Sequence, residues 1–176
     1  LEFRLTDKIK WGMWGYSNLN ILASKMWGRM PYLTMFIPQG NESFFMNMGG
    51  FNLVYEFTFA TDQYVMASFD HHFDGLILQA FPIFRKWKLR SVGNFRLLYG
   101  DMSPENRVAN ALNLYENTNP GDPVRVIIPN RTPYMEVSYG VENIFRLLRV
   151  DAVYKLTHQL DNMPDWGLRA NLIFKL

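Results

Sequence analysis

The stretch Trp166–Leu176, W-G-L-R-A-N-L-I-F-K-L, decides how the chain is interpreted. Every even-numbered position in it is apolar, and the odd-numbered positions include Gly167, Arg169, Asn171 and Lys175. Successive side chains of a β-strand point to opposite faces, so this stretch predicts a strand with one apolar and one polar face. About eleven residues suffice for a tilted strand to cross a bilayer. We therefore predict an all-β fold, a transmembrane antiparallel β-barrel or its C-terminal part, closed by this strand.

Composition agrees with a barrel, although it does not exclude a soluble β-domain with an aromatic core. The 176 residues are 48% apolar and 16% aromatic, yet the mean hydropathy is only −0.13. Interleaved apolar and polar positions produce this combination. The absence of cysteine excludes disulfides and thiolate metal sites, and a net charge of +2 with mixed signs argues against nucleic-acid binding. The chain starts at Leu1 without an initiator Met or signal peptide, so we expect a C-terminal fragment of a longer chain, forming a single barrel domain over residues 1–176.

Alternation elsewhere predicts six more strands, at Leu1–Met13, Phe51–Phe59, Tyr64–Phe73, Leu89–Tyr99, Tyr134–Asn143 and Val150–His158. The second and third of these are expected to form a hairpin around a turn at Ala60–Gln63. Leu19–Met30 is expected to form a short amphipathic helix. Barrels made of one bacterial chain have even strand numbers, so seven strands imply either one missed within Asn18–Ser43 or others upstream of Leu1. We favour the second explanation.

The connections between these strands differ in length. Gly100–Pro133 is expected to be a long surface loop with an extended piece at Val124–Ile128, and Asp161–Asp165 a turn. If the C-terminus lies at the periplasmic face, both segments and Ala60–Gln63 are external. The connectors Trp14–Gly50, Asp74–Lys88 and Ile144–Arg149 are then periplasmic, with short helical pieces.

Several stretches together resemble a family of outer-membrane proteins from Bacteroidetes-type, Gram-negative bacteria. They are W-G-R-M-P-Y (Trp27–Tyr32), G-N-E (Gly40–Glu42), F-D-H-H-F-D-G (Phe69–Gly75), L-L-Y-G (Leu97–Gly100) and P-Y-M-E-V-S-Y-G-V-E-N-I-F-R-L-L-R-V-D-A-V-Y (Pro133–Tyr154). Full-length members carry an N-terminal carboxypeptidase-regulatory-like domain, which is a β-sandwich, followed by a large barrel. The resemblance covers most of Trp27–Leu176 and implies the C-terminal part of that barrel. It implies no enzymatic activity and supplies no catalytic residues.

A set of titratable residues, nearly all charged, is expected to face the barrel lumen: Arg4, Glu56, Asp70, His72, Arg90, Arg96, Glu136, Glu142, Asp151, Lys155 and Arg169. Buried charges must pair or stay hydrated. They therefore form either an ion-pair network that fills the interior or the lining of a water-filled pore. The balance of signs favours the network.

The cluster Asp70-His71-His72-Phe73-Asp74 is the most tempting candidate for chemistry. Adjacent residues of a strand point to opposite faces, so the two histidines cannot bind one metal without a bulge. Ser68 and His72 share a face but lie about 13 Å apart along a strand, too far for a direct hydrogen bond. Ser138 is a second inward serine whose partner the sequence does not identify. We assign no catalytic, metal or cofactor residues, and we expect the protein to need no cofactor.

Two connectors mix large apolar side chains with cations, and their candidate contact residues are Phe81, Phe84, Arg85, Lys86, Trp87, Phe145, Arg146 and Arg149. Such segments can lie in the headgroup zone of a membrane. They can instead cap the lower mouth of the barrel, or dock a periplasmic or membrane partner.

The leading hypothesis is thus an integral protein of the cell outer membrane with a structural, assembly or partner-binding role, acting as a subunit of a complex. A porin-like or transport barrel for small solutes is the alternative, and a membrane-embedded hydrolase is the third hypothesis. The expected partners are outer-membrane lipid and other outer-membrane or periplasmic proteins, with no nucleic acid.

Overall fold

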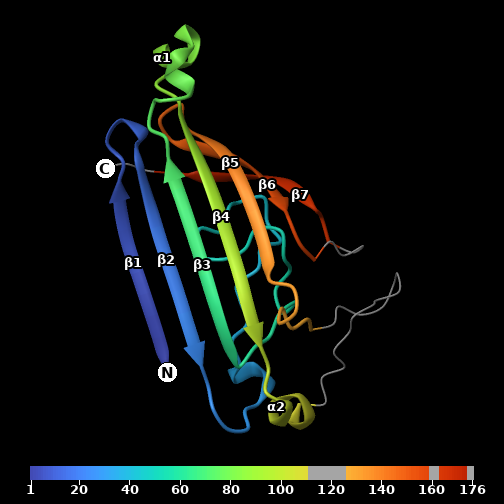
Figure 1. The fold of residues 1–176 in the computed structure, drawn as a ribbon. Coiled ribbons are helices and arrows are strands. Elements are labelled where there is room, and N and C mark those ends of the chain that lie inside the picture. The colour runs from blue at the N-terminus through green and yellow to red at the C-terminus, as the bar shows by residue number, and fades with distance from the viewer. Residues whose placement is uncertain (111–125, 159–162, 174–176) are drawn as a thin grey trace.

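The computed structural model describes residues 1–110, 126–158 and 163–173. Within these residues the chain forms one antiparallel sheet whose seven strands pair strictly in chain order (Figure 1). The strands are β1 (Glu2–Lys10), β2 (Tyr16–Lys25), β3 (Gln63–His72), β4 (Arg90–Asp101), β5 (Tyr134–Ile144), β6 (Leu148–Lys155) and β7 (Trp166–Leu172). The prediction of an all-β antiparallel fold is confirmed. The sheet is open, with β1 and β7 at its two edges.

Helices occur only as short pieces of the connectors in the described part of the chain. They are α1 (Pro82–Lys86), α2 (Pro104–Ala109) and single 3₁₀ turns at Gly12–Trp14, Tyr32–Thr34 and Leu78–Ala80. None of the described helices is long and apolar enough to cross a membrane. The helix α1 agrees with the helical connector expected between residues 74 and 88, whereas α2 lies in a segment predicted to be a loop.

The predicted helix at Leu19–Met30 is wrong, because β2 occupies most of that segment. Its alternation is clear around Asn18 and Asn20 but is interrupted at Leu22. Leu22 lies on the same face as these asparagines, yet it packs against a hydrophobic cluster. A strand that is polar at one end of a face and apolar at the other loses the simple two-residue period that identifies it.

The predicted strand at Phe51–Phe59, and its hairpin with Tyr64–Phe73, are also wrong. β3 pairs instead with β2 and β4. Phe51, Asn52, Leu53 and Val54 are each only 1% exposed, so consecutive residues are buried on every side rather than on one face. Phe57 has a φ of 63°, which ends the extended conformation. The count of seven strands therefore agrees with expectation only because one missed strand offsets one false strand.

The connector between β2 and β3 folds back over one face of the sheet. We call its residues 35–59 the folded-in segment, the face that they cover the inner face, and the opposite face the outer face. Figure 1 shows the segment in cyan and teal behind β3–β5. Its Phe51, Val54 and Phe59 join Tyr64, Leu98 and Tyr134 of the sheet in the main hydrophobic cluster. The core of the molecule thus lies between the sheet and its own connector.

The two ends of the sheet carry different connections. The connector end bears the turn 11–15, the connector 73–89 and the turn 145–147, which are short or helical. The loop end bears the longer connections, including the start of the folded-in connector and α2 (Figure 1). Only the beginning of Trp14–Gly50 lies at the connector end, so the expectation that this whole segment shares an end with Asp74–Lys88 is wrong. The stretch N-T-N-P-G-D-P and part of Asp161–Asp165 lie outside the described residues.

Candidate functional site

The carboxylate of Glu136 is the centre of the contact between the inner face and the folded-in segment. Its two oxygens accept hydrogen bonds from the backbone N–H of Asn52 at 2.9 and 3.1 Å. One of them also accepts the N–H of Leu53 at 3.3 Å and the hydroxyl of Tyr134 at 3.0 Å. Glu136 is 2% exposed, so these bonds replace its hydration. A strand carboxylate therefore provides the acceptors that a neighbouring strand would otherwise have supplied.

Two arginines hold the carbonyl groups of the same segment. Arg96 lies directly opposite Glu136 in the register of β4 and β5. Its guanidinium donates to the carbonyl oxygens of Asn47 at 2.7 Å and Met48 at 3.2 Å. Arg169 donates two hydrogen bonds, at 2.7 and 3.1 Å, to the carbonyl oxygen of Asn52. The charges of the inner face thus bind the folded-in backbone through both its donors and its acceptors.

The segment is shaped for this contact by its own asparagines. The side chain of Asn52 accepts hydrogen bonds from the Asn41 amide at 3.0 Å and from the backbone N–H of Asn47 at 2.8 Å. Asn47 in turn accepts the N–H groups of Gly49 and Gly50. Asparagine side chains commonly fix turns in this way. The segment also reaches the edge of the sheet, where residues 44–46 form a parallel bridge to Ala170 of β7.

A second polar cluster lies on the inner face nearer the connector end. Arg149 donates to both carboxylate oxygens of Asp151, at 2.7 and 2.8 Å, and both residues are at most 1% exposed. Asn94 donates to Ser138 at 2.6 Å and to Asp151 at 3.2 Å. Gly140 lies directly opposite Asp151, and a Cβ there would collide with that carboxylate. Arg149, expected in a connector at the membrane edge, is therefore a buried strand residue of this cluster.

The remaining charges of the predicted inner set differ in their surroundings. Lys155 is fully buried, with its Nζ 3.7 Å from Asp165, and Arg90 lies 3.7 Å from Asp74. Arg4 is exposed and pairs with Glu2 at 3.2 Å. Glu56 was expected on a strand facing inward, but it is an exposed residue of the folded-in segment. The structure thus brings together Arg96, Glu136 and Arg169 in one group and Arg149 and Asp151 in another.

The His71-His72 pair splits between the two faces, as strand geometry requires. His72 stacks on Tyr16, with ring centroids 4.5 Å apart, and its Nδ1 lies 3.5 Å from Glu142. Ser68 contacts Asn20 instead, and Ser138 contacts Asn94 and Asp151. Neither inward serine has the histidine partner that a hydrolase requires. No group of three or more His, Asp or Glu side chains is placed to hold a metal ion in the described ranges.

His71 lies on the outer face and forms a contact that the sequence did not suggest. Its Nδ1 is 2.7 Å from the Ser17 hydroxyl, and its Nε2 is 3.1 Å from the Trp14 carbonyl oxygen. The Trp11 indole donates to the same hydroxyl at 2.8 Å. Ser17 is fully buried beneath these groups, which argues against a nucleophile. The chain of hydrogen bonds instead fastens the first hairpin turn to β3.

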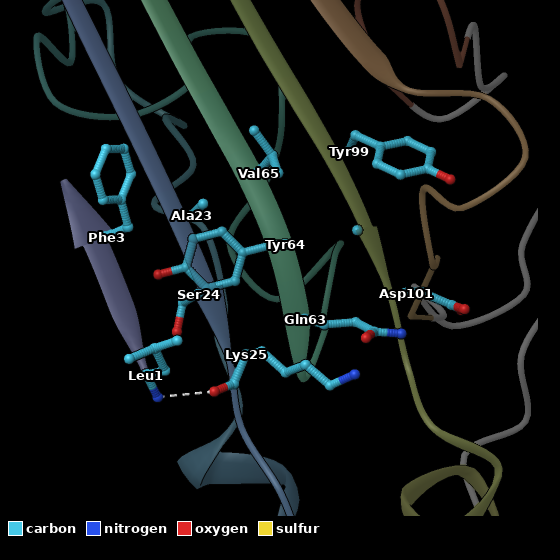
Figure 2. Close-up of a pocket in the computed structure, with 11 residues that line it drawn as sticks. Leu1, Phe3, Ala23, Ser24, Lys25, Gln63, Tyr64, Val65, Tyr99 and Asp101 are labelled. Atoms are coloured by element: carbon cyan, nitrogen blue, oxygen red, sulfur yellow. Dashed lines mark hydrogen bonds between the residues drawn. The ribbon is translucent and has the colours of Figure 1, made fainter. Parts of the chain in front are cut away.

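The outer face is apolar and open to its surroundings. Its exposed large side chains are 40–65% accessible and include Phe3, Leu5, Val65, Tyr99, Tyr139, Tyr154, Trp166, Leu168 and Leu172. Near the loop end these side chains border a groove of about 480 Å³. Figure 2 shows Phe3 and Tyr99 on either side of Ala23 and Val65, with polar residues below them. This face has the composition of an interior but no layer of protein covers it within the described chain.

At the connector end, hydrogen bonds join residues at the strand ends to neighbouring connectors. The carbonyl oxygen of Trp14 meets His71 beside the connector 73–89. Farther along, the Asn143 amide donates to the carbonyl oxygen of Lys88 at 2.8 Å. The large apolar side chains there are 36–88% exposed: Trp11, Met13, Trp14, Leu76, Ile77, Phe81, Ile83, Phe84, Trp87, Phe145 and Leu147. Each of them keeps at least 36% of its surface accessible.

Sequence reasoning missed the partners of the inner charges. It found Arg96, Glu136 and Arg169 but not Asn47 and Asn52, because Phe51–Phe59 alternates like a strand. The signal that could have separated the two cases is the density of asparagine and glycine just before it, in G-N-E and N-M-G-G. Such residues favour compact turns over a long periplasmic helix or strand.

Comparison with known families gives one match. Residues 1–105 match a family model described as "Family of unknown function (DUF5686) C-terminal domain". No curated protein and no solved structure matched the chain in the corresponding searches. The matched residues include Trp27–Tyr32 and Phe69–Gly75, two of the stretches that carry the resemblance noted from the sequence.

Proposed function

Starting from a chain that belongs to the DUF5686 family of unknown function and matches its C-terminal domain, we propose that it forms part of an integral β-barrel of the outer membrane. In this proposal the barrel is closed to small solutes and has a structural, assembly or partner-binding role. The main support for this proposal is that the usual distribution of charged and apolar side chains between interior and surface is reversed. Charged residues such as Arg149, Asp151 and Lys155 are buried on one face, while large apolar ones are exposed on the other. A water-soluble sheet has the opposite arrangement.

Strand lengths support the membrane proposal. The seven strands have 7–12 residues each, a range that brackets the about 9–11 residues of a tilted membrane-spanning strand. Closure of the barrel would use the free edge of β1, whose backbone groups face no partner on that side in the described chain. Closure on β7 would additionally require the bridge between residues 44–46 and Ala170 to open.

The folded-in segment favours the closed barrel over the porin-like alternative. Inner charges bind its backbone directly, so they are satisfied by protein rather than by water in a channel. The resemblance to Bacteroidetes-type proteins adds that full-length members carry a carboxypeptidase-regulatory-like domain before the barrel. We propose the same arrangement for the whole protein, with the barrel anchoring that domain and its partners at the outer membrane of Gram-negative cells.

Conductance in planar bilayers tests the closed barrel. We expect the reconstituted protein to resist extraction by alkaline carbonate and to give no stable conductance steps. The double variant Arg96→Ala/Arg169→Ala removes four hydrogen bonds to the folded-in segment and should produce steps. Arg4→Ala is the control, since Arg4 is on the same face but forms no hydrogen bond with the segment among the described residues. Steady conductance by the unmodified protein would instead support a porin, and complete carbonate extraction would contradict a membrane barrel.

A further inference from the structure

The connector end of the sheet carries an exposed apolar and cationic surface, which we call the connector rim. It consists of the turn 11–15, the connector 73–89 and the turn 145–147. Its aromatic members include Trp14, Trp87 and Phe145, which are 60%, 62% and 88% exposed. Side chains capping the mouth of a barrel would be buried by it, and these are not buried by any part of the described chain. The rim therefore resembles a surface that contacts a lipid bilayer or another molecule.

The cations of the rim lack acidic partners. Arg85, Lys86, Lys88 and Arg146 make no ion pair among the described residues, and Asp74, the acidic group nearby, is paired with Arg90. At the loop end, Arg107 pairs with Asp101 at 2.8 Å and Lys155 with Asp165, whereas Lys25 and Arg29 form no ion pair among the described residues. Exposed, unpaired cations set among aromatic side chains attract anionic groups from outside the chain.

The local backbone geometry keeps the apolar and cationic side chains of the rim exposed. Pro82 begins α1, a position that proline favours, and Arg85 and Lys86 occupy its last turn, where cations suit the helix dipole. Phe145 and Arg146 both have positive φ values, 49° and 67°, so the turn between β5 and β6 is held in a conformation that costs energy for residues other than glycine. Such a turn points its apolar and basic side chains away from the sheet.

From these observations we propose that the connector rim binds the anionic, phosphate-bearing headgroups of a lipid bilayer. Aromatic rings would lie at the boundary between hydrocarbon and headgroups, and the four cations would reach phosphate groups. The rim borders the apolar outer face, so both surfaces contact one bilayer. The inference rests on the proposed membrane location and adds the depth and the ligand chemistry of this end. A protein partner is the competing occupant.

Flotation with vesicles tests the charge requirement in the full chain. Arg85→Gln/Lys86→Gln should weaken association with vesicles containing phosphatidylglycerol roughly fivefold to thirtyfold, and should leave association with phosphatidylcholine vesicles unchanged. Lys25→Gln/Arg29→Gln is the matched control, because it removes two cations at the loop end. If both double variants behave alike, the rim does not bind headgroups. Carbonate extraction of the same vesicles tests membrane integration separately, so failure of one proposal is distinguishable from failure of the other.

Tryptophan quenching tests the depth and separates lipid from a protein partner. In a variant that keeps Trp87 and replaces Trp11, Trp14, Trp27 and Trp166 by Phe, lipids brominated near the headgroup should quench Trp87 more strongly than lipids brominated near the chain end. Aqueous iodide should quench it weakly. Strong quenching by iodide with none by brominated lipid would overturn the proposal and favour a surface that docks protein in the periplasm.

Discussion

The two faces of this sheet are made by the same strands but follow opposite rules. On the inner face, Glu136 and Arg96 are buried and bonded to the backbone of a connector. On the outer face, Phe3 and Trp166 are at least 60% exposed, and no part of the described chain packs over them. The chain therefore provides its own partner for its polar face and leaves the apolar face in contact with its surroundings. The proposed membrane barrel follows from this contrast between the two faces.

Removing the central acceptor of the inner face should have the largest effect. Glu136→Ala leaves two backbone N–H groups and the Tyr134 hydroxyl without their acceptor and leaves Arg96 beside an uncompensated site. Loss of one partner in a buried charged network costs about 3–5 kcal/mol. We expect urea unfolding in detergent micelles to show a loss of this size. Glu56→Ala is the control, since Glu56 is exposed on the same segment, and should change stability by less than about 0.5 kcal/mol. Equal effects would mean that the folded-in segment does not depend on Glu136.

A charge placed on each face in turn compares the faces directly. Leu5 and Thr6 are neighbours in the middle of β1, with Leu5 on the outer face and Thr6 on the inner face. In a bilayer, Leu5→Arg should cost about 2–4 kcal/mol, whereas Thr6→Arg should cost much less. Unfolding of the reconstituted variants gives both values. Equal costs would contradict a lipid-facing outer surface and favour a soluble sheet.

The same comparison cannot be made at Leu53 and Asn52, although the sequence alone suggests this pair. Alternation places Leu53 and Asn52 on opposite faces of a strand, but both are buried in the folded-in segment. Leu172→Arg against Asn171→Arg remains usable, because these residues lie in β7.

Sequence pattern predicted strands whose alternation is complete or nearly so, such as β7 and β1, where Asp7 alone is out of phase. It failed where one face changes character along a strand, as at Leu22 of β2, because the apolar patch there exists only to receive a distant connector. It also failed at Phe51–Phe59, where alternation is real but the backbone bonds to side chains instead of to a strand. The charges of the inner face were predictable from their position. Their partners were not, because long-range contacts between residues 52 and 136 or 169 leave no local signal in either segment.

The smallest expected effect concerns Asp62. Its side chain holds together the two ends of the connector between β2 and β3. Its carboxylate accepts the backbone N–H and the hydroxyl of Ser103, at 2.9 and 2.5 Å, and the Asn106 amide at 2.8 Å. Asn106 in turn donates to the Gly28 carbonyl oxygen and accepts the N–H of Met30, at the start of the connector. The clamp therefore joins the beginning of the connector, its end and α2.

The protonation of this clamp makes its contribution depend on pH. Burial alone would raise the pKa of Asp62, but the hydrogen bonds from Ser103 and Asn106 outweigh it and hold the pKa below its ordinary value of 3.8. A carboxyl whose pKa is lower in the folded state stabilises that state fully above its unfolded pKa, and this stabilisation is lost as the pH falls through the folded pKa. Asp62→Asn should reduce the free energy of unfolding by about 1–2 kcal/mol at neutral pH. The difference between Asp62→Asn and the unmodified chain should then shrink below pH 3.8. Glu105→Gln, an exposed change in α2, is the control and should show no such dependence. A difference that stays constant down to acid pH would show that the Asp62 charge does not hold the connector in place, and that the apolar cluster alone keeps the folded-in segment on the inner face.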